Sequence, residues 1–451
     1  IAPQFVRPLP FVLPLTALVV RGPWMMRAGF LLDALVAHDR NAGVPETHQL
    51  PSGQVISAID ARRQFPLLRD TRMYAAALWH DYVVTESDRL TLAWGLAAAN
   101  HGAVLVNHCE AVRLLRDGTR VVGAEVHDGL AGDRVEVGAR VVVNATGGDI
   151  DGLLASEQLS TRTPMLRAMN IVTRLSGGEA AIGGHSAGGR ALFMVPWRGQ
   201  ALFGTWESAG TCLPNERTPP AAELDAFVEA VAAAFPACGV TRHDLTLVHR
   251  GVVPAAVDAS GRVALEGRQQ LLDHAVAARP VDGLLSIAGT KYTTARAVAE
   301  TIVDLVLRKL SRSAEPCRTA TTPLPMAPRD VMTAPAPGSS SMAWPSDVRA
   351  HVVEAYGDSA DRVLALAEAR PEFADRLSDT ASIIGAEIAW AARHEMAMTL
   401  PDAVLRRTPL GALGHPGQTA VTRAARVMAS ELDWSAERLT REIAAVEAFY
   451  R

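Results

Sequence analysis

The spacing of apolar positions predicts both helices and strands over the first two thirds of the chain. Helices are expected near 24–38 and over 88–101, where apolar residues return every three or four positions. Runs of β-branched residues within 103–148, separated by Gly turns, predict a small antiparallel meander that returns into a main sheet. Further strands are expected within 165–210 and 246–290. This mixture is typical of an α/β protein.

Three other segments differ in composition. Residues 1–70 are rich in proline and predict irregular structure around the helix near 24–38. Residues 313–345 contain many Pro, Ser and Thr residues and predict a linker. From residue 346 to residue 451 the apolar pattern is helical, which predicts an all-helical C-terminal domain.

Two predicted strands end in Gly turns, Val141–Gly148 (VVVNATGG) and Leu284–Arg296 (LLSIAGTKYTTAR). A strand, a Gly turn and a helix start together present backbone N–H groups to an anionic or electron-rich ligand. The sequence therefore predicts a cofactor held between strand ends. The candidate cofactor-binding residues of these turns are Asn144, Thr146, Gly147, Gly289, Thr290, Thr293 and Thr294. Thr293 or Thr294 is also expected to cap the helix that follows.

Lys291 is the candidate catalytic residue. The other lysine is Lys309, and the remaining basic residues among the 44 are arginine. A lysine beside a Gly turn in a chain rich in arginine indicates that a compact ammonium is needed there. The alternative is a surface lysine that follows a turn.

Composition excludes several classes of function. The net charge is −4, and without a long basic run nothing indicates a nucleic-acid partner. The four cysteines are far apart, which indicates neither a disulfide framework nor a zinc site. His394 and Glu395 lack the second His of HExxH, so no metal site is predicted, and both are expected on a helix surface. The helix near 24–38 is expected either to pack on a domain or to lie on a membrane surface.

Five motifs in order, over essentially the whole chain, resemble FAD-dependent glycerol-3-phosphate dehydrogenases of the aerobic respiratory type. They are NATGG (144–148), MVPWRGQALFGTWE (194–207), GVVPA (251–255), SIAGTKYTTARAVAE (286–300) and AEIAWAARHEMAMTLPDAVLRRTPLG (386–411). The resemblance implies an α/β fold with a glutathione-reductase-type FAD-binding domain, interleaved with a substrate-binding sheet domain and followed by an all-α C-terminal domain.

The implied domains follow the segments predicted above. An FAD-dependent oxidoreductase region is expected over 1–312. Its FAD-binding parts are about 75–158 and 281–312, and its substrate-binding part is about 159–280. The linker 313–345 and the helical domain 346–451 complete the chain.

The sequence departs from the family pattern at the substrate and at the cofactor. Val253 stands where the family has an arginine, Asn170 where it has a histidine, and Thr290 where it has a second glycine. Arg268 matches a family arginine placed for substrate phosphate, and Arg250 or His249 could replace the missing one. The family's opening strand and GxGxxG are absent, so the sequence is expected to start about 80 residues late, the size of such an opening unit.

The resemblance implies oxidation of sn-glycerol 3-phosphate to dihydroxyacetone phosphate, with FAD as cofactor and electrons passed to a membrane quinone. Lys291, Arg268 and Asn170 are the expected substrate-binding residues. A cytoplasmic location is expected. Peripheral attachment to the inner face of the membrane and a homodimer are left open. Two alternatives remain: an FAD-dependent oxidoreductase acting on another hydroxy or amino substrate, and a non-catalytic remnant that has lost FAD binding.

Overall fold

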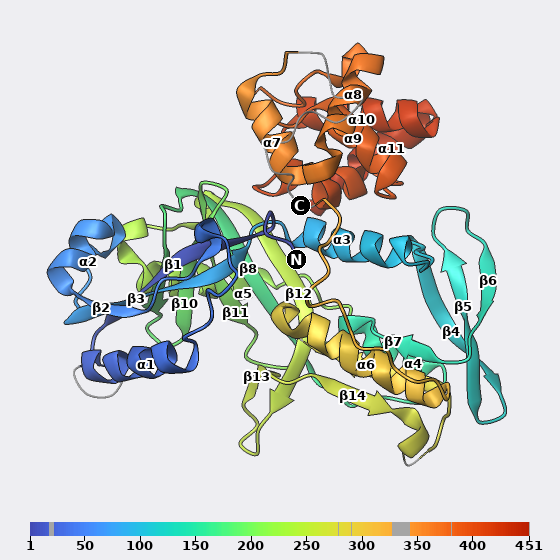
Figure 1. Cartoon of the computed structure of the whole chain (residues 1–451), viewed down its shortest axis with the longest axis horizontal. Coiled ribbons are helices and arrows are strands. Elements are labelled where there is room, and N and C mark those ends of the chain that lie inside the picture. Colours follow the sequence, from blue (N-terminus) through green and yellow to red (C-terminus); the bar gives the residue numbers. More distant parts are fainter. Residues whose placement is uncertain (18–21, 278, 290, 327–342, 380, 451) are drawn as a thin grey trace.

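The computed structural model describes all residues except 18–21, 278, 290, 327–342, 380 and 451. Figure 1 shows three parts: a large sheet with its helices, a second region built on two smaller sheets, and a helical unit above both. The helical unit is the C-terminal one, and α3 (Ser87–Asn100) lies beneath it.

The large sheet has the strand order β13-β12-β8-β11-β10-β9-β1-β3-β2. Its strands are β1 (Val6–Leu15), β2 (Gln54–Ser57), β3 (Ala75–Val84), β8 (Met165–Ser176), β9 (Ala181–His185), β10 (Ala191–Trp197), β11 (Gln200–Glu207), β12 (Leu245–Val257) and β13 (Val263–Leu265). The predicted strands within 165–210 and 246–290 are thus confirmed.

Helices cover both faces of this sheet. On one face, α5 (Ala221–Ala234) and α2 (Ala58–Gln64) join a core that includes Val12. On the other, α1 (Pro23–Val36) packs Met26 and Phe30 beside Leu13. Because successive side chains of a strand point to opposite faces, Val12 and Leu13 mark the two sides of β1. The helix predicted near 24–38 is therefore confirmed as α1.

The prediction of irregular structure over 1–70 is wrong for β1. This strand pairs with β3 along its whole length although it contains Pro8, Pro10 and Pro14. The backbone carbonyls of Phe5 and Leu15 accept hydrogen bonds from residues that flank β3. The backbone N–H and C=O groups at odd-numbered positions of β1 therefore point toward β3. The backbone nitrogens of the three prolines, at even-numbered positions, point to the other side of β1. On that side β1 pairs with β9 only at residues 11 and 12, so the missing N–H groups cost few hydrogen bonds.

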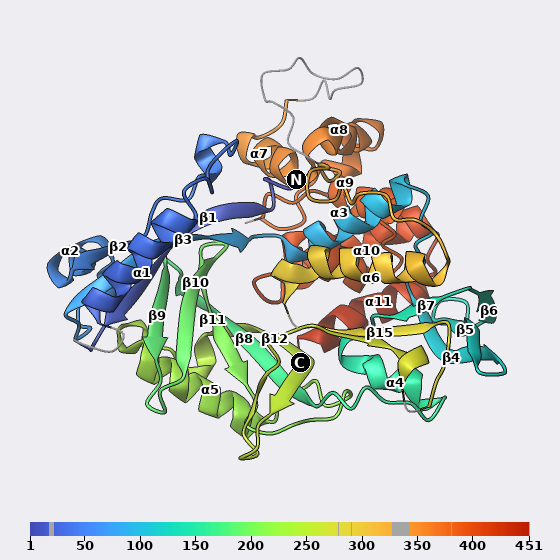
Figure 2. The ribbon, with the colours of Figure 1, turned by 60° about the horizontal axis from the view of Figure 1, so that its bottom comes forward.

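The second region holds two three-stranded sheets (Figure 2). The antiparallel meander predicted from the sequence is confirmed as β4 (Cys109–Asp117), β5 (Arg120–Asp128) and β6 (Arg134–Gly138). The other sheet has the order β14-β15-β7, with β14 (Gln270–Asp273), β15 (Leu284–Ala288) and β7 (Val142–Asn144). The helices of this region are α3, α4 (Ile150–Ala155) and α6 (Ala295–Lys309).

The parallel pairing of β15 with β7 brings the two predicted Gly turns together. Ser286 lies opposite Asn144, so both strands end at the same edge of the sheet. The chain leaves β7 into α4, and it leaves β15 into a short turn (Tyr292–Thr294) and then α6. Two segments about 140 residues apart in sequence thereby form one site, as parallel α/β strand ends do.

The C-terminal region is helical, as its apolar pattern predicts. It contains α7 (Ser346–Tyr356), α8 (Ala360–Ala369), α9 (Gly385–His394), α10 (Gln418–Leu432) and α11 (Ala436–Phe449). Ile384, Ile388 and Ala391 are fully buried in one core. Within the predicted linker, 327–342 lies outside the described residues.

The prediction that Glu395 lies on a helix surface is wrong. Its side chain is 1% exposed and forms an ion pair of 3.0 Å with Arg89 of α3, whose side chain is 2% exposed. The neighbouring arginines do not form an ion pair with Glu395 among the described residues. Arg393 pairs with Glu431 and Arg406 with Asp88, while Arg407 donates to the Glu395 backbone carbonyl. Glu395 therefore attaches the helical domain to the rest of the protein.

Candidate functional site

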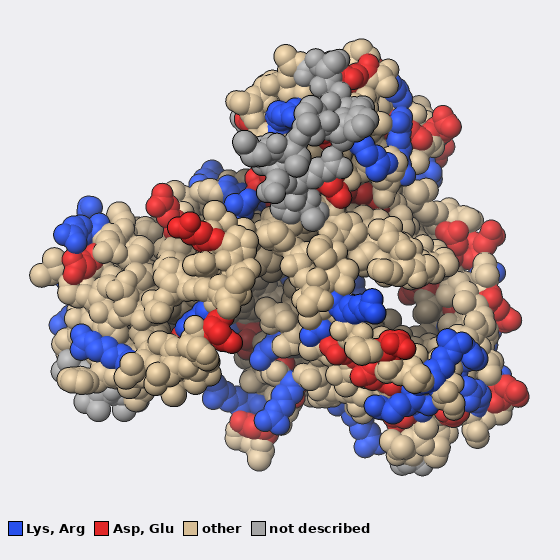
Figure 3. Space-filling view, viewed as in Figure 1, with Lys and Arg blue, Asp and Glu red and all other residues tan. Residues whose placement is uncertain are grey.

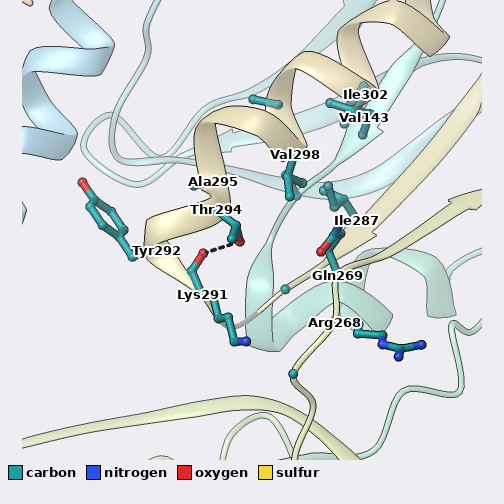
Figure 4. Close-up of a pocket in the computed structure, with 14 residues that line it drawn as sticks. Val143, Arg268, Gln269, Ile287, Lys291, Tyr292, Thr294, Ala295, Val298 and Ile302 are labelled. Carbon is teal, nitrogen blue, oxygen red and sulfur yellow. Dashed lines mark hydrogen bonds between the residues drawn. The ribbon is translucent and has the colours of Figure 1, made fainter. Parts of the chain in front are cut away.

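A cavity of about 490 Å³ lies where β7 and β15 end and α6 begins (Figure 4). Its wall is largely apolar, with Val143, Ile287, Val298 and Ile302 from the two strands and the helix. The remaining lining residues are Ala145, Gly267, Arg268, Gln269, Gly289, Lys291, Tyr292, Thr294, Ala295 and Ala299. An apolar cavity with a few polar groups at one end is typical of a ligand site in an α/β protein.

Lys291 lies at this cavity and Lys309 does not. Lys309 pairs with Asp273 at 2.9 Å and with Asp282 at 3.5 Å, so its charge is used within the protein. Lys291 forms no ion pair in the part of the chain that the structure describes. Its ammonium lies beside Gly267, 3.9 Å from where a Cβ would stand. Of the two lysines, Lys291 is thus the one available to an anionic ligand.

Arg268 lines the same cavity from the segment that precedes β14. Its backbone N–H donates to the carboxylate of Glu266 at 2.9 Å. Figure 4 shows its guanidinium pointing away from Lys291. The fold therefore brings the predicted substrate cations to one cavity from two segments, with their charged ends separated.

The polar side chains of the first Gly turn form hydrogen bonds within the turn itself. Asn144 is buried, donates to the Ile150 carbonyl at 2.8 Å and accepts from the Thr146 hydroxyl at 2.7 Å. Gly147 has φ +63°, a left-handed conformation that favours glycine. None of these three turn residues, Asn144, Thr146 and Gly147, lines the cavity. Asn144 organises the turn, and its neighbours Val143 and Ala145 face the cavity.

The second Gly turn faces the cavity more directly. Gly289 and Thr294 line it, Thr293 does not, and Thr290 lies outside the described residues. Thr294 is the N-cap residue of α6, but the predicted side-chain cap is not made. Its hydroxyl donates to the Lys291 carbonyl at 3.2 Å instead. The first N–H groups of α6 therefore have no side-chain cap at Thr294 and face the end of the sheet.

Asn170 lies on the large sheet and does not line this cavity. It is opposite His249 of β12, and Val253 lies further along β12 opposite Leu166. Side chains at 249 and 253 share a face of the strand, whereas Arg250 faces the other side. His249 packs edge-on to Trp197 with ring centroids 6.3 Å apart. Burial lowers the pKa of His249, against the nearby carboxylate of Asp88, and thereby favours the neutral imidazole.

Among the polar lining residues, sequence reasoning missed two, Gln269 and Tyr292. Tyr292 directly follows Lys291, and this position beside the candidate lysine was the only signal in the sequence that pointed to it. Gln269 precedes an edge strand and carries no pattern of its own. Among the residues the structure describes, no cluster of His, Cys, Asp or Glu could hold a metal ion, and no helix is both long and apolar enough to cross a membrane.

The described residues fit part of a flavin cofactor. Gly289 has open space on its cavity side, since a Cβ there would meet only Gln269 at 3.8 Å. The start of α6 directs its positive dipole end and its first N–H groups at the same place, and they would stabilise the negative charge of a reduced flavin bound there. The apolar wall of Val143, Ile287 and Val298 suits a flat ring.

Comparison with known proteins supports the cofactor and the architecture. The family described as FAD dependent oxidoreductase matches residues 24–305, and the C-terminal domain of alpha-glycerophosphate oxidase matches residues 317–439. Glycerol-3-phosphate dehydrogenase 2 of Mycobacterium bovis is 28% identical over 98% of this chain and 74% of its own length. Glycerol-3-phosphate dehydrogenase of Synechocystis is 27% identical over 98% of this chain and 81% of its own length.

A solved structure shares the fold of the whole chain. The glycerol-3-phosphate dehydrogenase from Bacillus halodurans, complexed with FAD, superimposes with a TM-score of 0.74 at 20% sequence identity, over 100% of this chain and 82% of that one. The sheets and the helical C-terminal domain thus belong to one known architecture. This chain belongs to the FAD-dependent oxidoreductase family, in the branch whose members carry the C-terminal domain of alpha-glycerophosphate oxidase.

Proposed function

We propose that this protein oxidises sn-glycerol 3-phosphate to dihydroxyacetone phosphate with FAD and passes the electrons to a membrane quinone. The observation that carries the proposal is Lys291, an ammonium without a carboxylate partner among the described residues, at the cavity where two parallel strands end. The relatives named above bear the name of this dehydrogenase.

Lys291 and Arg268 are the proposed phosphate-binding residues. A phosphate dianion needs more than one positive partner in a partly desolvated site, and the two side chains come to the cavity from separate segments. Glycerol lacks the phosphate, so these groups would discriminate against it.

FAD, when bound, supplies the acceptor for the hydride that leaves C2 of the substrate. Gly289, Thr293 and Thr294 are proposed to lie against it, because they surround the start of α6. The proton of the C2 hydroxyl must pass to a base. None of the described residues that line the cavity is His, Asp or Glu, so this base is expected from outside that lining.

Transfer to a quinone requires contact with a membrane, and α1 is the proposed contact. Met26 and Phe30 face inward, while the outer side of α1 is apolar. The exposed large apolar residues of α1 are Trp24, Met25, Leu31, Leu32, Leu35 and Val36, and Trp24 and Val36 are 77% and 74% exposed. They lie four or seven positions apart in pairs, and this spacing places them on one side of the helix as a stripe. Figure 3 shows few charged side chains over α1 at the lower left.

An exposed apolar stripe of this kind marks an interaction surface, since soluble surfaces rarely keep so many large apolar residues together. An amphipathic helix of this length can lie in the membrane interface without crossing it. The quinone acceptor and the peripheral location are therefore proposed together.

A second candidate is an FAD-dependent oxidoreductase for another hydroxy or amino substrate. Val253 and Asn170 favour it, because both put an uncharged side chain on the substrate sheet where the family has a charged or titratable one. A substrate without phosphate would need fewer cations.

Substrate competition decides between the two. The protein carrying its FAD is assayed with an artificial electron acceptor, using sn-glycerol 3-phosphate and unphosphorylated glycerol. Turnover of the phosphate ester with little turnover of glycerol supports the proposal. Equal turnover of the two compounds would refute it and favour the second candidate. Absence of flavin absorbance in the purified protein would indicate a non-catalytic remnant.

A further inference from the structure

The hydroxyl of Tyr292 connects the Lys291 turn to α3. It lies 2.9 Å from the Thr91 hydroxyl and 3.4 Å from the Ser87 carbonyl. The Thr91 hydroxyl itself lies 2.9 Å from the Ser87 carbonyl. Thr91 and Tyr292 each have one hydroxyl hydrogen, so one of the two hydroxyls donates to the other and that other donates to the Ser87 carbonyl.

The turn that carries Lys291 is short and depends on its neighbours. Lys291 is extended, with φ −96° and ψ 111°, and a single 3₁₀ turn (Tyr292–Thr294) follows it. The backbone N–H and the hydroxyl of Thr294 both donate to the Lys291 carbonyl, at 3.3 and 3.2 Å. Those bonds fix the turn internally. The Tyr292 hydroxyl fixes it against another element.

Helix α3 is a firm anchor for this contact. Two residues from Ser87 along α3, Arg89 is buried against the helical domain, where it pairs with Glu395 and donates to the backbone carbonyls of Ala355 and Arg407. The residues that contact the Tyr292 hydroxyl therefore belong to a helix that the helical domain holds in place.

We propose that Tyr292 is a positioning residue for Lys291: its hydrogen bond to Thr91 holds the turn so that the ammonium faces the cavity. This inference rests on the proposed role of Lys291 in binding the substrate phosphate. Tyr292 does not touch the reacting atoms. Tyr292 is one of the residues that line the cavity, but its ring points away from the other lining side chains (Figure 4) and its hydroxyl bonds to α3.

The test compares Tyr292→Phe with Thr91→Val and Thr91→Ser in the protein carrying its FAD. Tyr292→Phe and Thr91→Val should each lower kcat/KM for glycerol 3-phosphate about threefold to tenfold, the range that one hydrogen bond spans, mainly through a higher KM. The double variant should be no worse than Tyr292→Phe alone, since that change already removes the bond to Thr91. Thr91→Ser retains the hydroxyl and should keep normal kinetics.

A matched control is Tyr82→Phe. Tyr82 is partly exposed like Tyr292, and its hydroxyl donates to the His48 carbonyl at 2.6 Å, on the large sheet. Its removal should leave the kinetics unchanged. A thermal unfolding scan of each variant separates loss of folding from loss of position.

The lysines provide a second readout that does not depend on turnover. Lys291 and Lys309 can be labelled by reductive ¹³C-methylation and distinguished by Lys291→Arg. Tyr292→Phe should change the Lys291 signal and weaken its response to glycerol 3-phosphate, while the Lys309 signal stays constant. An unchanged Lys291 signal would overturn the inference.

The Lys291→Ala background separates this inference from the proposed function. If Tyr292 acts through Lys291, adding Tyr292→Phe to Lys291→Ala should not lower kcat/KM further. An undiminished effect there would refute the positioning role alone. If Lys291→Ala itself has normal kinetics, the proposed role of Lys291 fails and the inference falls with it.

Discussion

Arg89→Met should destabilise the protein more than the loss of a surface ion pair. Arg89 is 2% exposed and pairs with Glu395, which is 1% exposed, at 3.0 Å. It also donates to the carbonyls of Ala355 and Arg407, at 3.1 and 2.7 Å, and lies over the ring of Tyr356 at 4.3 Å. Methionine fills much of the same space without a charge or a donor.

The expected cost follows from what Arg89→Met leaves behind. Glu395 would be a buried carboxylate without a counter-ion, and removing one partner of such a pair costs about 3–5 kcal/mol. The carbonyls that lose a donor add to this cost, although water entering the interface would reduce their share. A loss of at least about 3 kcal/mol in the free energy of unfolding of the helical domain is therefore expected.

Urea unfolding followed by tryptophan fluorescence measures this loss. Trp390 and Trp434 belong to the core of the helical domain and report on it. Because unfolding of a two-domain protein need not be two-state, a far-ultraviolet circular dichroism curve should accompany the fluorescence. Arg63→Met is the control, since Arg63 pairs with Asp60 at the surface with 73% of its side chain exposed. Such a pair contributes at most about 1 kcal/mol.

The double variant Arg89→Met with Glu395→Met tests the reason for the loss. If the unpaired buried charge dominates, removing Glu395 as well should restore part of the stability. A loss below about 1 kcal/mol in Arg89→Met, similar to that of Arg63→Met, would refute the reasoning and mean that water reaches Glu395.

Three further predictions concern the site, the membrane contact and pH. Lys291→Ala should lower kcat/KM for glycerol 3-phosphate at least about tenfold while FAD stays bound, because a charge-assisted contact is lost, and normal steady-state kinetics would contradict this. Leu35→Glu in α1 should weaken sedimentation with phospholipid vesicles, whereas Ile59→Glu, 76% exposed on α2 outside the stripe, should not; equal binding of both would exclude α1 as the contact. Burial opposes the charged form of His351, but the carboxylate of Glu387, 3.0 Å away, raises its pKa overall. The pair should therefore stabilise the fold fully below about pH 6.5, the ordinary histidine pKa, and lose this effect as pH rises through the raised value. Unfolding curves of His351→Gln should lack that loss, and an identical pH slope would contradict the assignment.

The sequence by itself determined the elements whose pattern is local. The helices α1 and α3 and the strands of the meander follow from apolar spacing, because a helix or strand buries one face at a fixed period. Lys291 could be selected because lysine is rare in this chain and follows a Gly turn. The five ordered motifs indicated the family, which the comparisons confirm.

Tertiary structure alone decided which residues meet. Proline-rich β1 can be a strand because the backbone nitrogens of its prolines point away from β3. The local sequence does not predict which side of the strand faces β3. Asn144 turns inward to hold its own loop, although its sequence pattern suited a ligand contact equally well. Glu395 is buried by Arg89, 306 positions away, and Tyr292 bonds to Thr91, 201 positions away. Periodicity describes how one segment faces its surroundings, and contacts between distant segments depend on how the sheets and helices pack together.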